Sequence, residues 1–497
     1  MSAGAGGTQG RHGLLDGIVG QARRTPRAPA LVWRDEEISY GTLLRLAARE
    51  RGRIAHLPGD EPVAVPAVKS PATIALVLAC LLERRPVLLP AATLGPQALD
   101  RLHRQAGVQE VLRPCATDAS GPRADPPAHP APPTGRPALL LTTSGSTGLP
   151  KIVPLHPDAL DAFAGWAGAA FGIAPGTTVL NYAPLNFDLC LLDVWTTLAH
   201  GGRVVLVDPD HALDGARLLG LLRRHEVHVV QAVPMLFRLL ADAADATGTC
   251  LPAVRHAMFT GDAIPGPLLG RLPGLLPGAR LHNVYGCTET NDSFLHEVDA
   301  GAPVTTPLPL GAPLPGVQAL VVSAEGAVLA GPGTGELLVS TPFQTRGYLG
   351  VAAARQVLVP HPERDDGRCY FRSGDLVRRH PDGSLTLEGR TDHQVKVRGV
   401  RVNTQEVEHL LLGHREVTEA AVLALPDPVA GRLLHAVVRR APGSGLNSLT
   451  LRGHLARRLP RAAVPSVLRI TDDALSRTST GKVDRDRVAS AHFTKEN

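Results

Sequence analysis

A run rich in glycine and hydroxyl side chains is the segment best suited to chemistry. Residues 141–151 read Leu-Thr-Thr-Ser-Gly-Ser-Thr-Gly-Leu-Pro-Lys. Glycines let a backbone approach an anion closely, and hydroxyls and backbone N–H groups can donate hydrogen bonds to phosphate oxygens. Lys151 adds a cation, but Pro150 before it and Ile152 after it depart from a Walker loop. The run predicts a phosphate-binding loop of another kind, with a flexible polar turn as the alternative.

Several further motifs follow this loop in order along the chain. They are Asn-Val-Tyr-Gly-Cys-Thr-Glu at 283–289, Gly-Glu-Leu at 335–337, Arg-Gly-Tyr at 346–348, Tyr-Phe-Arg-Ser-Gly-Asp at 370–375, Gly-Arg-Thr-Asp-His-Gln-Val-Lys-Val-Arg-Gly at 389–399, and Thr-Gly-Lys-Val-Asp-Arg at 480–485. Together they resemble the motifs of the adenylate-forming superfamily, which contains acyl-CoA ligases, luciferases and the adenylation domains of nonribosomal peptide synthetases. The resemblance covers nearly the whole chain.

The resemblance implies that ATP is a substrate and Mg²⁺ a cofactor. A carboxylate that attacks the α-phosphate builds negative charge on phosphate oxygens, so cations and a metal suit the chemistry. Glu289 would hold Mg²⁺, with Thr288 beside it, and Lys482 would bridge the carboxylate and the α-phosphate during adenylation only. The nucleotide would be bound by Thr143, Ser144, Gly145, Ser146, Thr147, Gly148, Lys151, Asp262, Tyr285 (stacked on adenine), Asp375 (on the ribose) and Arg390. Asp392 would be the hinge about which a small domain turns, exchanging Lys482 for the face that carries Gly399.

Asp188, in the run Asn-Phe-Asp-Leu-Cys at 186–190, distinguishes two classes within the superfamily. In amino-acid-activating members an Asp at this position faces the substrate ammonium, whereas acyl- and aryl-CoA ligases lack it. A helix-capping Asp is the alternative interpretation. By the same resemblance the substrate side chain would be lined by Leu189, Leu192, Gln231, Met258, Thr260, Val284, Asp292 and Ser293. Gln231 and Asp292 fit poorly in an apolar pocket, and they indicate a substrate with a hydrogen-bond donor, a second amine, or a β-amino group.

The acceptor is expected to be the phosphopantetheine thiol of a carrier protein supplied in trans. The sequence runs only to Asn497 beyond Lys482, which leaves no room for a carrier domain. A free-standing amino acid–carrier protein ligase of natural-product biosynthesis fits this layout best. Residues 402–405, Val-Asn-Thr-Gln, lack the usual Glu-x-Gly on the face used for the thiol step, so the particular acceptor stays open. An acyl- or aryl-CoA ligase and a non-catalytic binding homologue are the alternatives.

Bulk composition excludes several other classes. The net charge is +5, from 51 Lys and Arg against 46 Asp and Glu, and the basic residues are scattered, so a nucleic-acid partner is not expected. The six cysteines show no paired spacing that would favour zinc or disulfides. The N-terminal residues lack the apolar core of a signal peptide, and no long apolar run predicts a membrane span. A cytoplasmic enzyme without membrane contact is therefore expected, of open oligomeric state.

The elements that must position these motifs indicate an α/β fold. Apolar runs at 138–142, 204–207 and 227–233 predict strands, and the patterns at 159–171 and 235–244 predict helices. Residues 310–390 are richer in turn signals and short strands. We expect a large N-terminal domain of layered α/β subdomains plus a β-rich subdomain over 1–390, with a Pro-rich loop at 113–137. A small mobile α+β domain would follow over 391–497, with a hairpin around Gly399 and a helix from Asn403 to Gly413.

Overall fold

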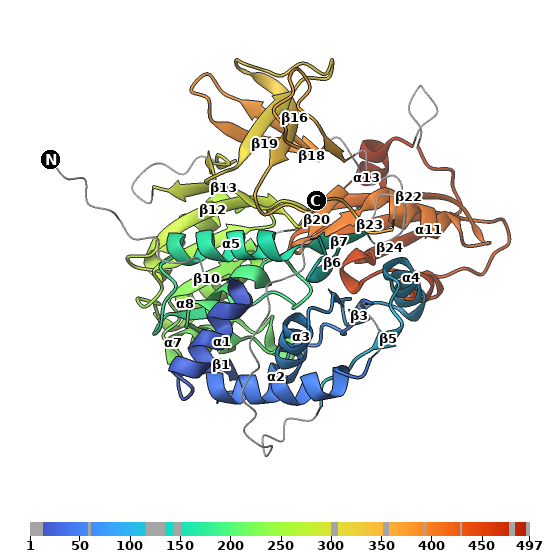
Figure 1. The fold of residues 1–497 in the computed structure, drawn as a ribbon. Coiled ribbons are helices and arrows are strands. Elements are labelled where there is room, and N and C mark those ends of the chain that lie inside the picture. The colour runs from blue at the N-terminus through green and yellow to red at the C-terminus, as the bar shows by residue number, and fades with distance from the viewer. Residues whose placement is uncertain are drawn as a thin grey trace.

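The computed structural model describes residues 13–57, 61–115, 135–143, 151–299, 307–350, 357–390, 394–427, 430–476 and 483–493. Most of the 113–137 loop lies outside these ranges. In the described part of the chain, no helix combines the length and the apolar character needed to cross a membrane. The layers of the molecule are shown in Figure 1.

The central sheet of the large domain is mostly parallel. Among the described residues it contains nine strands in the order β14-β13-β12-β11-β10-β8-β9-β1-β2, of which β1, β9, β8, β10, β11 and β12 run parallel to their neighbours in that series. The bounds are β1 (Pro29–Trp33), β2 (Glu36–Ser39), β8 (Thr178–Asn181), β9 (Arg203–Leu206), β10 (Val229–Ala232), β11 (His256–Thr260), β12 (Arg280–Cys287), β13 (Asn291–Val298) and β14 (Ala312–Pro313). Buried strands of this kind read as short Val- and Leu-rich runs, which is why residues 204–207 and 227–233 predicted them.

Helices cover both faces of this sheet and bury two apolar cores (Figure 1). One face packs against α1 (Leu14–Arg24), α5 (Pro157–Ala170), the π-helix η1 (Leu191–Thr196) and α6 (Thr197–Ala199). The other packs against α7 (Gly215–Arg224), α8 (Pro234–Thr247), α9 (Gly266–Leu269) and α10 (Leu272–Leu275), beside the short η2 (Pro209–His211). Parallel strands flanked by helices on both faces confirm the predicted α/β fold class.

A second sheet of the large domain carries the start of the glycine-rich run. Its strand order is β5-β3-β4-β6-β7, with β3 (Val63–Ala64), β4 (Val87–Leu88), β5 (Glu110–Val111), β6 (Leu139–Thr143) and β7 (Lys151–Leu155). The helices α2 (Tyr40–Ile54), α3 (Pro71–Leu82) and α4 (Pro96–Ala106) accompany it. Ser70 caps α3 by accepting a hydrogen bond from the Thr73 backbone N–H at 3.1 Å, and every residue of α3 is buried.

The β-rich subdomain lies above the central sheet in the view of Figure 1. It has the order β15-β16-β18-β17, with β19 paired to β18, and all of its pairs are antiparallel. The strands are β15 (Gln318–Val322), β16 (Gly333–Ser340), β17 (Leu358–Val359), β18 (Tyr370–Arg379) and β19 (Leu385–Arg390). The turn-rich composition of residues 310–390 predicted this subdomain correctly.

The C-terminal unit has apolar cores of its own. A hairpin of β20 (Gln394–Val397) and β21 (Val400–Asn403) precedes α11 (Thr404–Leu412) and the sheet β22 (Val417–Asp427), β23 (Gly431–Arg440) and β24 (Val467–Thr471). The helices α12 (Ser448–Ala456), η4 (Arg461–Ala463) and α13 (Arg485–Phe493) complete it. The hairpin turns at Gly399 as predicted, and the Asn403 side chain accepts hydrogen bonds from the backbone N–H groups of Gln405 and Glu406, so the predicted helix start is confirmed.

Candidate active site

The carboxyl ends of parallel strands gather four of the predicted pocket residues. Gln231 on β10 lies directly beside Met258 on β11, and Thr260 on β11 lies directly beside Val284 on β12. All four are buried. Side chains two residues apart on a strand share a face, so these four belong to the face that packs against η1. Ligands of open α/β sheets bind at this edge, beyond the carboxyl ends of the strands.

Glu289 joins three motifs that are far apart in the sequence. It lies in the turn between β12 and β13 and is almost fully buried. Its Oε1 accepts a hydrogen bond from the Tyr348 hydroxyl at 2.7 Å and a longer one, 3.5 Å, from the Thr143 hydroxyl. The Lys151 ammonium lies over the Tyr348 ring, 4.7 Å from its centroid. Glu289, the predicted metal ligand, therefore lies close to both ends of the glycine-rich run, Thr143 and Lys151.

Asp375 lies at the centre of a second cluster, where β18 pairs with β19. Its direct cross-strand partner is Arg390, and the two side chains form an ion pair. Arg390 Nη2 also donates to the Ser373 carbonyl oxygen at 2.9 Å, while the Tyr285 hydroxyl donates to Asp375 Oδ2 at 2.5 Å. Burial raises the pKa of Tyr285, and the Asp375 charge acts in the same direction, so the phenol stays protonated and donates. Each carboxylate oxygen has a further lone pair that can accept from a ribose hydroxyl.

Asp188 lies in the turn that leads into η1. Its Oδ1 accepts a hydrogen bond from the backbone N–H of the next residue, Leu189, at 3.0 Å, and Cys190 rather than Asp188 is the N-cap of η1. Burial raises the pKa of Asp188, a hydrogen bond with the Thr288 side chain lowers it, and the charges of Glu289 and Lys396 act in opposite directions on it. Asp188, predicted to distinguish the two classes of enzyme, therefore lies next to the Thr-Glu pair of the 283–289 motif.

The remaining predicted pocket residues come from the turn before η1, from η1 itself and from β13. Leu192 is fully buried and Leu189 partly so. Asp292 is 8% exposed, and burial followed by the charge of Asp188 raises its pKa to about 7. The Ser293 hydroxyl donates to Thr290 Oγ1 at 3.1 Å and lies 3.2 Å from a backbone carbonyl, so it already has partners within its own turn.

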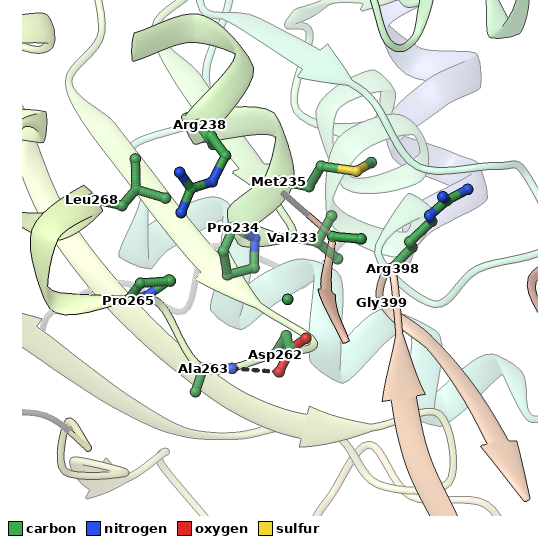
Figure 2. Close-up of a pocket in the computed structure, with 12 residues that line it drawn as sticks. Val233, Pro234, Met235, Arg238, Asp262, Ala263, Pro265, Leu268, Arg398 and Gly399 are labelled. Carbon is green, nitrogen blue, oxygen red and sulfur yellow. Dashed lines mark hydrogen bonds between the residues drawn. The ribbon is translucent and has the colours of Figure 1, made fainter. Parts of the chain in front are cut away.

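A cavity lies between the large domain and the small C-terminal unit (Figure 2). Figure 2 shows Asp262 and Val233 on one side and the hairpin residues Arg398 and Gly399 on the other. Asp262 Oδ1 accepts from the Ala263 backbone N–H at 2.9 Å. The structure thus places Asp262, predicted to be part of the nucleotide site, at the surface on which the hairpin docks. The full lining is Val233, Pro234, Met235, Arg238, Asp262, Ala263, Pro265, Leu268, Arg398, Gly399, Ala430 and Gly431.

Sequence reasoning assigned no role to Lys396, which the structure brings to the site. This lysine lies on β20, and its charge lowers the pKa of both Asp188 and Asp262. Its sequence signals are its place in the 389–399 motif and its position between Val395 and Val397, which puts it on the opposite face of the strand from those valines.

Some predicted residues lie outside the described part of the chain. They are Ser144, Gly145, Ser146, Thr147, Gly148, Asp392 and Lys482. Within the described residues, no group of three or more His, Cys, Asp or Glu side chains could hold a metal ion by itself. Mg²⁺ in nucleotide sites is commonly bound by one or two carboxylates together with substrate phosphates, and the buried Glu289 beside the ends of the glycine-rich run fits that type of site.

The chain belongs to the AMP-binding enzyme family. The family profile matches residues 19–349, and the profile of the AMP-binding enzyme C-terminal domain matches residues 406–482. Family membership and the α/β fold were both predicted from the motifs, and both are confirmed.

Similar proteins include two L-proline–[L-prolyl-carrier protein] ligases. The one from Pseudomonas fluorescens is 36% identical over 71% of this chain and 68% of its own length, and the one from Streptomyces coelicolor is 36% identical over 71% and 65%. The solved structure of a nonribosomal-peptide-synthetase protein containing adenylation and carrier domains, PA1221, superposes with a TM-score of 0.83 at 25% identity, covering 96% of this chain and 84% of that one. The amide bond synthetase McbA from Marinactinospora thermotolerans has the same fold, with a TM-score of 0.84 at 24% identity over 97% and 99% of the two chains.

Proposed function

We propose that this enzyme activates the carboxylate of an amino acid with ATP, releases pyrophosphate, and passes the aminoacyl group to the phosphopantetheine thiol of a separate carrier protein. The observation that carries the proposal is the position of Asp188 beside Thr288 and Glu289. A carboxylate there can pair with a substrate ammonium while the substrate carboxylate points toward the phosphate motif. The carrier-protein ligases among the similar proteins support the second step.

In the first step a carboxylate oxygen of the substrate attacks the α-phosphorus of ATP. The new bond gives an aminoacyl adenylate, and the bond to pyrophosphate breaks. Asp375 would orient the ribose, with its own carboxylate fixed by Tyr285 and Arg390. Glu289 would hold Mg²⁺, which supplies charge neutralisation at the leaving phosphates. Lys482 would neutralise the α-phosphate as negative charge develops there.

In the second step the carrier thiol attacks the acyl carbonyl, a thioester forms, and AMP leaves with the bonding electrons. The small domain, divided from the large one at residues 390 and 391, would turn about Asp392 between the two steps. The Gly399 hairpin docks beside Val233 of the large domain, and the charge of Lys396 on the same hairpin lowers the pKa of Asp188. A small domain that presents this hairpin to the site is compatible with the thiol-transfer arrangement. A pathway of natural-product synthesis would supply the carrier.

The test is ATP–pyrophosphate exchange with pairs of acids that differ only by the amine. We expect exchange with one amino acid and none with its deaminated analogue, and we expect Asp188→Asn to remove most of that exchange. Asp210→Asn is the matched control, because Asp210 is exposed on η2. Exchange only with acids that lack an amine would replace the proposal with an acyl- or aryl-CoA ligase, and a complete absence of exchange would favour a non-catalytic binding protein.

A further inference from the structure

Asp292 is a buried carboxylate for which the described part of the chain supplies no hydrogen-bond donor to the side chain. The residue is 8% exposed, and its own backbone N–H donates to Asn291 Oδ1 at 3.2 Å. Asn291 has a φ of +58°, and the pairing of β12 with β13 shifts register between Tyr285 and Gly286. The left-handed residue and the bulge re-aim the start of β13, as such irregularities do next to active sites.

The surroundings of Asp292 make its ionised form costly. An isolated buried carboxylate is strongly disfavoured unless a cation or several donors compensate it. Gly286, the direct cross-strand partner of Asp292 on β12, has no side chain that could donate. The Ser293 hydroxyl already donates within its own turn. A donor that arrives with the substrate would therefore stabilise the ionised form of Asp292.

Two other titratable groups interact with Asp292 electrostatically. The charge of Asp188 adds to burial in raising the pKa of Asp292 to about 7. Asp193, on η1, is fully buried, and burial raises its pKa well above the usual range, so it adds little charge at neutral pH. Asp188 and Asp292 are close in the fold for a simple reason: Asp188 forms a hydrogen bond with the Thr288 side chain, and Thr288 is in the same β12–β13 hairpin, four residues before Asp292.

We infer that the substrate is a short-chain diamino acid, whose α-ammonium pairs with Asp188 and whose side-chain ammonium pairs with Asp292. This inference rests on the proposed function, which it deepens. Two cations neutralise the buried Asp292 and the partly buried Asp188, and carboxylates near enough to act on each other match two ammonium groups a few bonds apart. The ring of L-proline carries one ammonium and no second donor, so it would leave Asp292 uncompensated. The amino acid of the similar ligases is therefore not the one that this pocket fits.

The experiment compares kcat/KM in pyrophosphate exchange for diaminobutyrate, norvaline, L-proline and β-alanine. Norvaline has a methyl group where diaminobutyrate has its second amine. We expect diaminobutyrate to be preferred, and we expect Asp292→Asn to reduce its kcat/KM by about 10- to 100-fold without reducing that of norvaline. Asp210→Asn, at an exposed site, serves as the control, and unchanged circular dichroism shows that each variant is folded.

The pH dependence of the KM for diaminobutyrate gives an independent test. As the pH falls through about 7, Asp292 takes up a proton in the free enzyme and loses its attraction for a cation. The KM for diaminobutyrate should therefore rise more steeply below that pH in the wild type than in Asp292→Asn, in which only Asp188 still titrates against the substrate.

The outcomes separate the two proposals. Preference for norvaline, L-proline or β-alanine, or an equal loss for all substrates in Asp292→Asn, overturns the diamino acid inference while amino-acid activation stands. Absence of exchange with every amino acid, including longer diamino acids, overturns the proposed function and the inference with it.

Discussion

Replacing Gly399 by alanine should slow thiol transfer strongly while leaving adenylation nearly intact. Gly399 is at the turn of the β20–β21 hairpin with a φ of +78°, and a Cβ added there would lie 2.2 Å from Val233 Cγ1. Val233 belongs to the large domain, so this contact exists only while the hairpin is docked. If the domain turns away for adenylation, the added methyl group has nothing to meet.

The added methyl group has two free-energy costs, and only one of them changes the docking of the hairpin. The left-handed φ costs an L-residue roughly 1–2 kcal/mol, but that strain is local to the hairpin and is the same in both domain positions. Overpacking against Val233 costs about 1–3 kcal/mol and applies to the docked state alone. The docked population, and with it the rate of transfer, should fall by about 5- to 150-fold. At 2.2 Å the contact is too close to be absorbed by small shifts, which favours the upper end.

The assay measures the two half-reactions separately. Adenylation is followed by pyrophosphate exchange, and transfer by thioester formation on free phosphopantetheine from preformed adenylate. Gly443→Ala is the matched control, since Gly443 has a φ of +74° in the same small domain and a Cβ there would meet nothing within 4 Å. Val233→Ala removes the clashing atom and should restore transfer to Gly399→Ala. Equal losses in both half-reactions, or no rescue by Val233→Ala, would refute the reasoning.

Three further changes should each affect one property. Asp375→Asn should raise the KM for ATP by about 10- to 100-fold, because it weakens charged hydrogen bonds to the ribose, and should leave the KM for the amino acid unchanged in initial-rate kinetics. Burial raises the pKa of Glu406 to about 7, so its ionisation destabilises the fold increasingly as the pH rises from 4.5 toward 7. Glu406→Gln should therefore add ~3 kcal/mol to the free energy of unfolding at about pH 8 and little at about pH 4, as measured by denaturant titration; an equal gain at both pH values would contradict this. Lys482→Ala should abolish pyrophosphate exchange yet still transfer supplied adenylate to a thiol, and normal exchange would show that its assigned role is wrong.

Local patterns were enough to predict much of the fold. The apolar run at 227–233 and the amphipathic pattern at 235–244 correspond to β10 and α8, with ends that differ by a few residues. Strand and helix periodicities depend on which side chains face the core, and this information is present in a short window of sequence. The π-helix η1 escaped prediction because an i to i+5 turn has no distinctive pattern of apolar residues.

The sequence indicated candidate residues for the site but not the contacts among them. Asp375 and Arg390 are 15 positions apart, and the resemblance of their motifs to those of the superfamily was enough to associate them. The contact of Thr143 with Glu289 spans 146 positions, and the action of Lys396 on Asp188 requires docking of two domains. Such contacts depend on the global arrangement of sheets, which local periodicity does not encode. The unpartnered state of Asp292 likewise becomes visible only when all of its neighbours are in place.

The most direct test of the central claim follows an oxygen atom. The amino acid that best supports exchange is labelled with oxygen-18 in its carboxylate and incubated with ATP, the enzyme and phosphopantetheine, and the products are analysed by mass spectrometry. Attack of the carboxylate on the α-phosphorus followed by thiol transfer leaves one labelled oxygen in AMP and none in pyrophosphate. Label in inorganic phosphate, or AMP without label, would contradict the formation of an aminoacyl adenylate.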